Sequence, residues 1–192
     1  MIVSDLTFSP RDIKRLARLQ VEVLPDSAIS KLGQRYVRSF YRYAQRSPLE
    51  LVLVERNEAG VIVAGCVVSL DVSSLERRLA LHTRLLFEAG LRPVWLWSTI
   101  RNLGGPGVPH SVELIYLFTD AKARGRGSAT RLMVEAEAEL RHRKIPEYAV
   151  RTFEDPGNPA LAYYLGRGLK LSGTLQAHGS SFCVLTKKLV QE

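Results

Sequence analysis

The stretch that decides the fold runs from residue 119 to residue 129 and reads Thr-Asp-Ala-Lys-Ala-Arg-Gly-Arg-Gly-Ser-Ala. It follows an apolar run over residues 112–119, typical of a buried strand, and leads into a helical pattern over residues 125–144. Small residues at a strand-to-helix turn let backbone N–H groups approach an anion, and the first N–H groups of a helix have no partner inside it. The stretch therefore predicts an anion-binding turn, for which pyrophosphate is the natural ligand. A tight turn with surface arginines is the alternative.

Three cations, Lys122, Arg124 and Arg126, strengthen the anion site. The turn is not a P-loop, because no Gly-Lys-Ser/Thr follows its glycines. It is also a poor dinucleotide fingerprint, because Thr130 stands where the third glycine belongs.

Strand and helix patterns alternate on both sides of this turn. Strand patterns cover residues 2–8, 49–55, 61–70, 112–119, 147–153, 169–176 and 181–189. Helical patterns cover residues 10–24, 27–46, 125–144 and 158–166, with a helical insertion at 73–103. This order predicts an α/β (α+β) fold with a central sheet of about seven strands flanked by helices.

The composition is that of an ordinary globular chain, with 192 residues, 46% hydrophobic and 24% charged, so we expect one domain over residues 1–192. Cys66 and Cys183 lie in strand-like apolar runs and predict buried free thiols, which suit a reducing compartment. No Cys/His cluster indicates a metal site. The longest uncharged runs are too short to cross a membrane, and no targeting segment is evident, so we expect a cytoplasmic protein.

The net charge is +8 and the pI is near 9.8, which favours anionic partners. Five cations at spacings of three and four form a ridge on the predicted helix 27–46: Lys31, Arg35, Arg38, Arg42 and Arg46. A solvated helix face is the simplest interpretation. A contact for an acidic substrate or partner is the alternative.

The turn and the segment after it resemble the GNAT superfamily of acetyl-CoA-dependent N-acyltransferases. The cofactor loop of that family reads Arg/Gln-x-x-Gly-x-Gly/Ala, which Arg124, Gly127 and Ala129 match in spacing. Downstream the family shows Asn, Ala, Tyr and a Gly-aromatic pair, which Asn158, Ala160, Tyr164 and Gly168-Leu169 resemble. The chain departs from the pattern at Ser128 and Leu169, and the Asn158-to-Tyr164 spacing is one residue short.

The resemblance implies a mixed, mostly antiparallel sheet and acetyl-CoA as co-substrate. The cofactor contacts that it implies are Leu117, Phe118, Thr119, Arg124, Gly125, Arg126, Gly127, Ser128, Ala129 and Asn158. A backbone N–H near Leu117 or Phe118 would stabilise the oxyanion.

Two catalytic side chains follow from the same resemblance. Tyr164 matches the tyrosine that serves the leaving thiolate; a half-buried structural aromatic is the alternative. Glu113, a carboxylate in an apolar strand, is the candidate base, with a structural or water-holding role as the alternative. His110 and His178 are weaker candidates.

The implied activity is direct acetyl transfer to a primary amine of a small molecule, an amino sugar, a protein or an RNA-linked acceptor. The insertion at 73–103 should lie near the acceptor side. Its Trp95 and Trp97 suit core or interface packing, or a pocket wall. A homodimer is compatible with the family. The alternative function is an inactive basic module that binds nucleic acid or a protein. For the protein as a whole, nucleic acid is not a favoured partner and a membrane is not expected.

Overall fold

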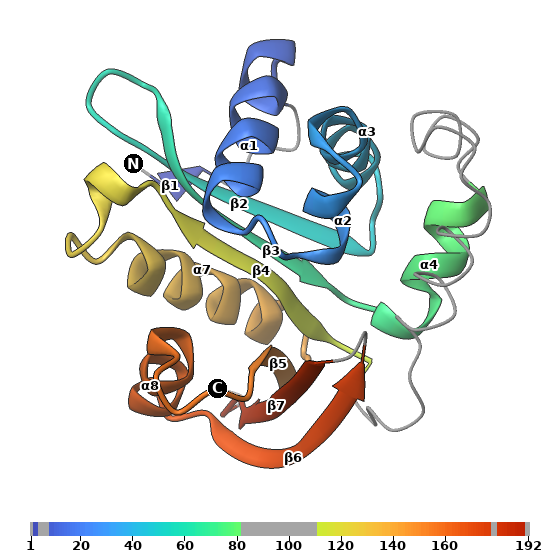
Figure 1. Cartoon of the computed structure of the whole chain (residues 1–192), viewed down its shortest axis with the longest axis vertical. Helices are drawn as coiled ribbons and strands as arrows, with labels where there is room; N and C mark the ends of the chain where they lie inside the picture. The colour runs from blue at the N-terminus through green and yellow to red at the C-terminus, as the bar shows by residue number, and fades with distance from the viewer. Residues whose placement is uncertain (1, 4–7, 82–110, 178–179, 191–192) are drawn as a thin grey trace.

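The computed structural model describes residues 2–3, 8–81, 111–177 and 180–190. They form a seven-stranded sheet in the order β1-β2-β3-β4-β5-β7-β6, with helices on both faces (Figure 1). Every neighbouring pair of strands is antiparallel except β4 and β5. The predicted mixed, mostly antiparallel sheet flanked by helices is confirmed.

The strands are β1 (Ile2–Val3), β2 (Glu50–Arg56), β3 (Ile62–Ser69), β4 (Glu113–Thr119), β5 (Glu147–Phe153), β6 (Lys170–Ala177) and β7 (Ser180–Lys188). The helices are α1 (Pro10–Val23), α2 (Ala28–Lys31), α3 (Gln34–Ala44), α4 (Val72–Leu81), α7 (Ser128–His142) and α8 (Pro159–Gly166), with a 3-10 turn η1 (Ala121–Ala123).

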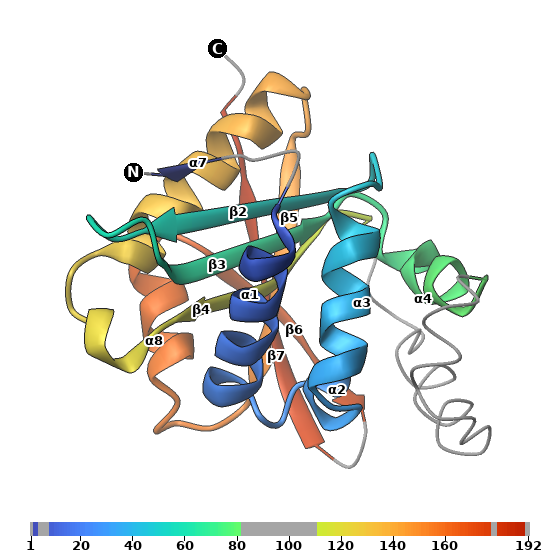
Figure 2. The same ribbon diagram turned by 90° about the horizontal axis from the view of Figure 1, so that it is seen from above.

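Helices α1 and α3 lie side by side on one face of the sheet, and α7 and α8 cover the other (Figures 1 and 2). The alternation of strand side chains feeds one apolar core on each face. The core under α1 and α3 includes Phe40, Tyr41 and Phe118. The core under α7 and α8 includes Leu132, Met133 and Tyr164, so the two faces are separate packing environments.

The start of α1 follows directly from its sequence. Ser9 accepts a hydrogen bond from the Asp12 backbone N–H, the Asp12 carboxylate accepts one from the Ser9 backbone, and Pro10 stands at the first helical position. This reciprocal cap satisfies two backbone donors that the helix cannot satisfy itself.

The prediction of one helix over residues 27–46 is wrong. Gly33 adopts φ 91°, a left-handed conformation that few other residues tolerate, and it separates α2 from α3. Lys31 therefore lies on a different helix from Arg35, Arg38 and Arg42, and Arg46 follows the end of α3.

Three other predictions need adjustment. The predicted helix at 125–144 begins only at Ser128, because the loop before it continues through Gly127. Of the predicted first strand, Ile2–Val3 is observed as β1, residues 4–7 lie outside the described residues, and Phe8 is not part of a strand. Of the predicted insertion at 73–103, α4 forms the first part; its remainder, with Trp95 and Trp97, lies outside the described residues, as do His110 and His178.

Both cysteines are free and buried, as predicted. Burial raises the pKa of the Cys66 thiol to about 12, so this side chain is a neutral core group. Within the described ranges, no His, Cys, Asp and Glu side chains gather in a group that could hold a metal ion. In the same part of the chain, no helix has the length and apolarity needed to cross a bilayer.

Candidate active site

The central feature of the site is the separation of two parallel strands. β4 and β5 pair only at Glu113 with Ala149 and at Leu114 with Val150, although both strands continue for several residues. A β-bulge lies at the same place, because Tyr116 and Leu114 pair with consecutive residues of β3 and leave Ile115 without a cross-strand partner there. Beyond Leu114, β4 therefore has a ladder partner on the β3 side only.

This separation frees backbone groups in the middle of the sheet. Residues in an antiparallel ladder alternately aim both backbone groups at the partner strand and away from it. Leu117 and Phe118 pair with Cys66 and Gly65 of β3, so one of the two aims its N–H towards the gap left by β5. An oxyanion donor at this position stays a prediction.

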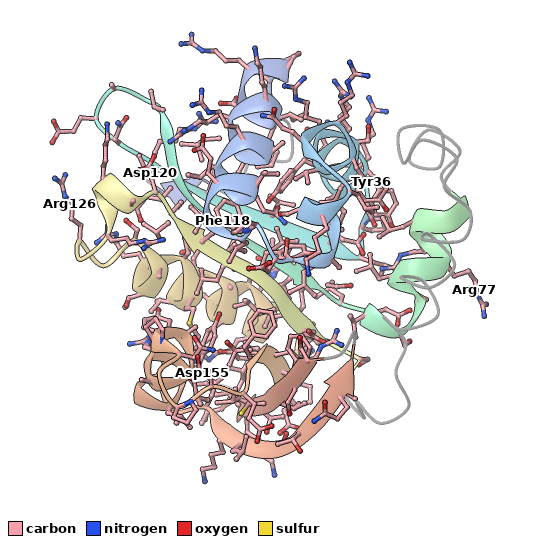
Figure 3. The ribbon with its side chains drawn as sticks, in the orientation of Figure 1. Tyr36, Arg77, Phe118, Asp120, Arg126 and Asp155 are labelled. Atoms are coloured by element: carbon pink, nitrogen blue, oxygen red, sulfur yellow. The ribbon has the colours of Figure 1, made fainter. Side chains whose placement is uncertain are left out.

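The side chain of Phe118 is committed to the core. Its ring covers Gly65, where a Cβ atom would lie 2.5 Å from the ring. Figure 3 labels Phe118 at the centre of the sheet, and it is 2% exposed. Gly65 thus leaves room for the outer end of the Phe118 ring against β3.

The loop after β4 has the backbone of an anion site. Gly125 and Gly127 adopt φ 73° and 76°, left-handed conformations that glycine tolerates without strain. Gly127 caps α7 without a side-chain hydrogen bond, so the first N–H groups of this 15-residue helix remain available to a ligand. The arrangement is a cradle of backbone donors at the positive end of a helix dipole.

Charge and an unsatisfied hydroxyl complete the cradle. Lys122, Arg124 and Arg126 are exposed and have no ion pair among the described residues. The hydroxyl oxygen of Thr119 is buried and, within the same residues, has no hydrogen-bond partner. A diphosphate supplies acceptors and negative charge for these groups, so the loop fits the pyrophosphate of a coenzyme A ester.

The start of the loop is anchored to α1. Asp120 accepts a hydrogen bond from the Lys122 backbone at 3.0 Å and forms an ion pair with Arg15 at 2.5 Å. The hydrogen bond to the Lys122 backbone and the pairing with Arg15 lower the pKa of the Asp120 carboxyl below its usual value. Asp120 and Arg126 lie at the same end of β4 in Figure 3.

The underside of the loop is held by a network that the sequence did not reveal. Ser128 is buried and donates from its hydroxyl to Glu55 of β2 at 3.2 Å. Arg131 donates to both carboxylate oxygens of Glu55, at 2.6 and 3.2 Å, and to the Arg126 carbonyl at 2.8 Å. Ser128 therefore turns its side chain away from the cradle and offers a ligand only its backbone.

This network also orients the peptide group between Arg126 and Gly127. A trans peptide holds its C=O and its N–H in opposite directions. Because the Arg126 carbonyl points to Arg131, the Gly127 N–H points the other way, out of the network. Ser128, which departs from the family pattern, thus acts with Glu55 and Arg131 to fix the orientation of this peptide group.

Tyr164 lies on α8, on the α7 face of the sheet. It is 7% exposed, and its hydroxyl has no hydrogen-bond partner among the described residues. Burial raises the pKa of this phenol above its ordinary value, and Cys66 adds to the shift. Cys66 pairs with Leu117, so Tyr164 approaches the sheet at the strand position where β4 has parted from β5.

The neighbouring Tyr163 is occupied elsewhere. Its hydroxyl lies 3.4 Å from the Thr130 hydroxyl in the first turn of α7, and its ring packs edge-on against that of Tyr164. Of the two adjacent tyrosines, Tyr164 is the one with an uncommitted hydroxyl.

Asn158 has a structural role in the placement of Tyr164. Its amide oxygen caps α8 by accepting from the Ala160 N–H at 3.0 Å. Its amide nitrogen donates to the Thr152 hydroxyl and the Phe153 carbonyl, at 2.9 and 2.8 Å. These bonds join α8 to the end of β5; a contact between Asn158 and the cofactor stays a prediction.

Glu113 lies on the opposite face of the sheet from Tyr164. It alternates with Leu114, which belongs to the α7-side core, and it influences Tyr116 under α3. Glu113 is 2% exposed and accepts a hydrogen bond from Arg151 Nε at 2.7 Å. The two predicted catalytic side chains therefore flank β4 from its two faces, and they are not in contact.

The face that carries Glu113 has an aromatic lining. Tyr36 of α3 and Tyr116 of β4 interact electrostatically, and Phe40 packs edge-on against Tyr116 with ring centroids 6.0 Å apart. Burial raises the pKa of Tyr36 to about 12, so its hydroxyl stays protonated at neutral pH. Figure 3 labels Tyr36 at the α3 side of the sheet.

The fold and the loop together define an α/β domain in which β4 parts from β5 and leads into a glycine loop at the start of α7. The chain matches the Acetyltransferase (GNAT) family over residues 20–169 and belongs to it. No curated protein matches the sequence.

Solved structures support the same fold at low sequence identity. An aminoglycoside 6'-N-acetyltransferase complexed with coenzyme A has a TM-score of 0.69 at 13% identity, covering 100% of this chain and 98% of that one. An N-acetyltransferase from Staphylococcus aureus Mu50 has a TM-score of 0.64 at 12% identity, covering 99% and 98%. The ribosomal-protein-S18-alanine N-acetyltransferase from Escherichia coli has a TM-score of 0.63 at 9% identity, covering 100% and 95%.

Proposed function

We propose that the protein is an N-acetyltransferase that moves an acetyl group from acetyl-CoA to a primary amine by direct transfer. One observation carries the proposal: β4 parts from β5 beyond Leu114 and leads into a glycine cradle at the start of α7. The gap offers a backbone donor for an acyl oxygen, and the cradle offers backbone donors for a diphosphate. Acetyl-CoA carries both groups and supplies the activated acetyl thioester.

The N–H in the gap, from Leu117 or Phe118, would stabilise the negative charge that develops on the thioester oxygen when the amine attacks. Tyr164 would donate its proton or a hydrogen bond to the sulfur as the C–S bond breaks. The raised pKa of Tyr164 suits this role, because the phenol keeps its proton at the pH where the thiolate needs one.

The attacking amine must be neutral, so the site needs a proton acceptor. We propose Glu113 for this task on the α3 face of the sheet, with the acceptor amine approaching from that side. Because Glu113 is nearly covered and paired with Arg151, the proton would reach it through water. Glu113→Gln should then lower kcat more than it changes the KM for acetyl-CoA.

For the acceptor, we propose a primary amine on a small molecule, an amino sugar or a protein. Of Tyr36, Phe40 and Tyr116 on the Glu113 face, only Tyr116 is half-buried, and its ring would pack against the apolar part of such a molecule. The structurally similar enzymes are named for an aminoglycoside and for a protein alanine, which spans the same range. The buried free thiols suit a reducing compartment, and we propose a cytoplasmic location.

The first test is a calorimetric titration of the purified protein with acetyl-CoA, with NAD as the control ligand. We expect micromolar binding of acetyl-CoA and none of NAD. Arg124→Ala should weaken binding by removing a cation, and Gly127→Val by forcing a side chain into a left-handed φ of 76°. Absence of acetyl-CoA binding at millimolar concentration contradicts the proposal.

A further inference from the structure

The outer surface of α1, α2 and α3 carries most of the net charge of the chain. Residues 10–46 hold nine lysines and arginines against three acids, a net charge of +6 out of +8. Nitrogen-tipped side chains project from the outer sides of α1 and α3 (Figure 3). We call the following set the basic face: Arg11, Lys14, Arg18, Lys31, Arg35, Arg38, Arg42 and Arg46.

Most of this charge is not neutralised by the residues that the structure describes. Of the basic face, only Arg18 has an ion pair among the described residues, with Glu22 at 2.7 Å. The acid that α1 carries in its first turn, Asp12, is drawn inward to Arg56 of β2 at 2.7 Å. Seven cations are therefore left without a carboxylate partner in the part of the chain that the structure describes.

The arrangement also disfavours α3 in the free protein. This helix has no acid, carries Arg35 in its first turn against the helix dipole, and places Arg38 and Arg42 at like-charge spacings. Its cap, Gly33, provides no side-chain hydrogen bond to offset the repulsion. A polyanion seated on the helix would remove this repulsion.

The composition of the basic face selects among polyanions. Six of its eight cations are arginines, whose planar forks bind phosphate oxygens in pairs. Protein interfaces are centred on apolar and aromatic anchors. The exposed large apolar side chains of the described residues all lie elsewhere: Val61, Val134, Phe153, Leu165, Leu171 and Val190. The basic face thus offers contacts to phosphates and no apolar centre for a protein partner.

We propose that the basic face binds the phosphate backbone of a nucleic acid, without reading its base sequence. A basic domain with cations clustered along one helix has the electrostatic pattern of such binding. The surface lies on the outer side of α1 and α3, and none of its residues belongs to the glycine cradle at the start of α7. Nucleic acid and acetyl-CoA therefore use different residues, and the proposal stands independently of acetyl transfer.

The test is the binding of a labelled single-stranded RNA of mixed sequence and about 20 nucleotides, long enough to exceed a typical single-strand site. Binding is followed by fluorescence anisotropy between about 50 and 200 mM salt, because each phosphate contact contributes about −0.7 to the slope of log K against log salt. The key variant combines Arg35→Gln, Arg42→Gln and Arg46→Gln. We expect it to bind more weakly and to lose about 2 from the magnitude of that slope.

A matched control removes the same charge from another surface. Lys144, Lys170 and Lys188 are exposed and have no ion pair among the described residues, and all three are changed to Gln. This variant should keep the salt slope of the unaltered protein. Both variants should keep the melting temperature and the acetyl-CoA affinity of the unaltered protein, which shows that each is folded.

Three outcomes overturn the proposal. The unaltered protein fails to bind the RNA, or the two triple variants lose the same slope, so that net charge alone matters. The third is that polyglutamate displaces the RNA as well as an equal charge of unlabelled RNA does, which points to an acidic polypeptide as the ligand. Failure of acetyl-CoA binding in the unaltered protein bears on the proposed enzyme and leaves this test unaffected.

Discussion

The helices on the two faces of the sheet differ in whether their charged side chains have ion-pair partners. Both arginines of α7 have carboxylate partners: Arg131 pairs with Glu55 at 2.6 Å and Arg141 with Glu137 at 3.6 Å. On the other face, seven of the eight cations of the basic face have no such partner among the described residues. The two layers share one sheet and similar packing, yet only one of them balances its charge internally.

The difference indicates what each layer is for. On the α7 face, charge is used to hold elements together: Glu137 accepts from the buried Tyr148 hydroxyl and from Lys187 of β7, at 2.8 and 2.6 Å. On the α1 face, the inward charges Asp12 and Arg15 serve the same purpose, while seven cations of the basic face have no carboxylate partner among the described residues. Cations that have no carboxylate partner within the described residues are available to bind an anionic partner.

The largest effect should come from the α8 tyrosine on the balanced face. Tyr164→Phe removes one hydroxyl from a site where the ring is already packed, so the fold should be unchanged. We expect kcat to fall by about 100-fold or more, the range of a lost general acid, with acetyl-CoA affinity retained. Steady-state kinetics and calorimetry on the same preparation measure the two quantities.

Tyr163→Phe is the matched control, because it removes a hydroxyl that already bonds to Thr130. It should change kcat by much less than Tyr164→Phe. Equal losses in the two variants would show that neither hydroxyl acts on the leaving group.

The next effect tests the network beneath the loop. Arg131→Ala removes the bond to the Arg126 carbonyl and leaves the buried Glu55 carboxylate without its cation, near the expected diphosphate. We expect the Kd for acetyl-CoA to rise about tenfold, equivalent to ~1.4 kcal/mol. S-acetylpantetheine is an acetyl donor that lacks the pyrophosphate. The Arg131→Ala variant should use it as well as the unaltered protein does.

Arg141→Ala is the control for the same helix, since its pairing with Glu137 lies away from the loop. If Arg131→Ala weakens the use of both acetyl donors equally, the arginine supports the fold in general and has no specific role under the pyrophosphate.

The loop also shows what the sequence could and could not predict. Its glycines, its cations and the strand before it are local signals, and they were sufficient to predict a strand, a turn and a helix in this order. The start of α7 was predicted at Gly125 because composition does not reveal φ; the left-handed glycines 125 and 127 delay it to Ser128. Gly33 is a similar indication of a helix break within the predicted helix 27–46. The helical spacing of the apolar residues favoured one continuous helix there.

Local sequence signals do not predict which side chains pair when they are far apart in the sequence. The sequence shows Ser128 only as a departure from the family pattern. The hydrogen bond that explains this serine is made to Glu55, 73 residues away. Glu113 was singled out as a costly carboxylate in an apolar strand, but its partner Arg151 comes from the parallel neighbour β5. Which charges meet depends on strand order, and a single sequence specifies strand order only through the completed fold.

A smaller effect concerns the inward charge of α1. The hydrogen bond from Arg56 is the largest cause that lowers the pKa of Asp12, to about 2. A depressed carboxyl pKa stabilises the fold above the unfolded value near 3.8, and this contribution is lost as the pH falls towards 2. Because solvent reaches the pair, we expect Asp12→Asn to cost about 1 kcal/mol at neutral pH.

Urea denaturation at a series of pH values checks this sign. The stability curves of Asp12→Asn and the unaltered protein should be separate at pH 7 and converge as the pH falls to about 2. A difference that persists at low pH would assign the loss to the cap at Ser9 and not to ionisation.

The smallest expected effect is a change in the free energy of unfolding on the basic face. It tests the comparison of the two faces directly, because this substitution should not lower stability. Arg42→Gln removes a like-charge neighbour of Arg38 and Arg46 from the basic face and breaks no ion pair. We expect the free energy of unfolding to stay constant or to rise by ~0.3 kcal/mol at low salt, with the gain disappearing as salt screens the repulsion. A loss of stability at low salt would mean that Arg42 supports the fold, and the basic face would then no longer contrast with the ion-paired arginines of α7.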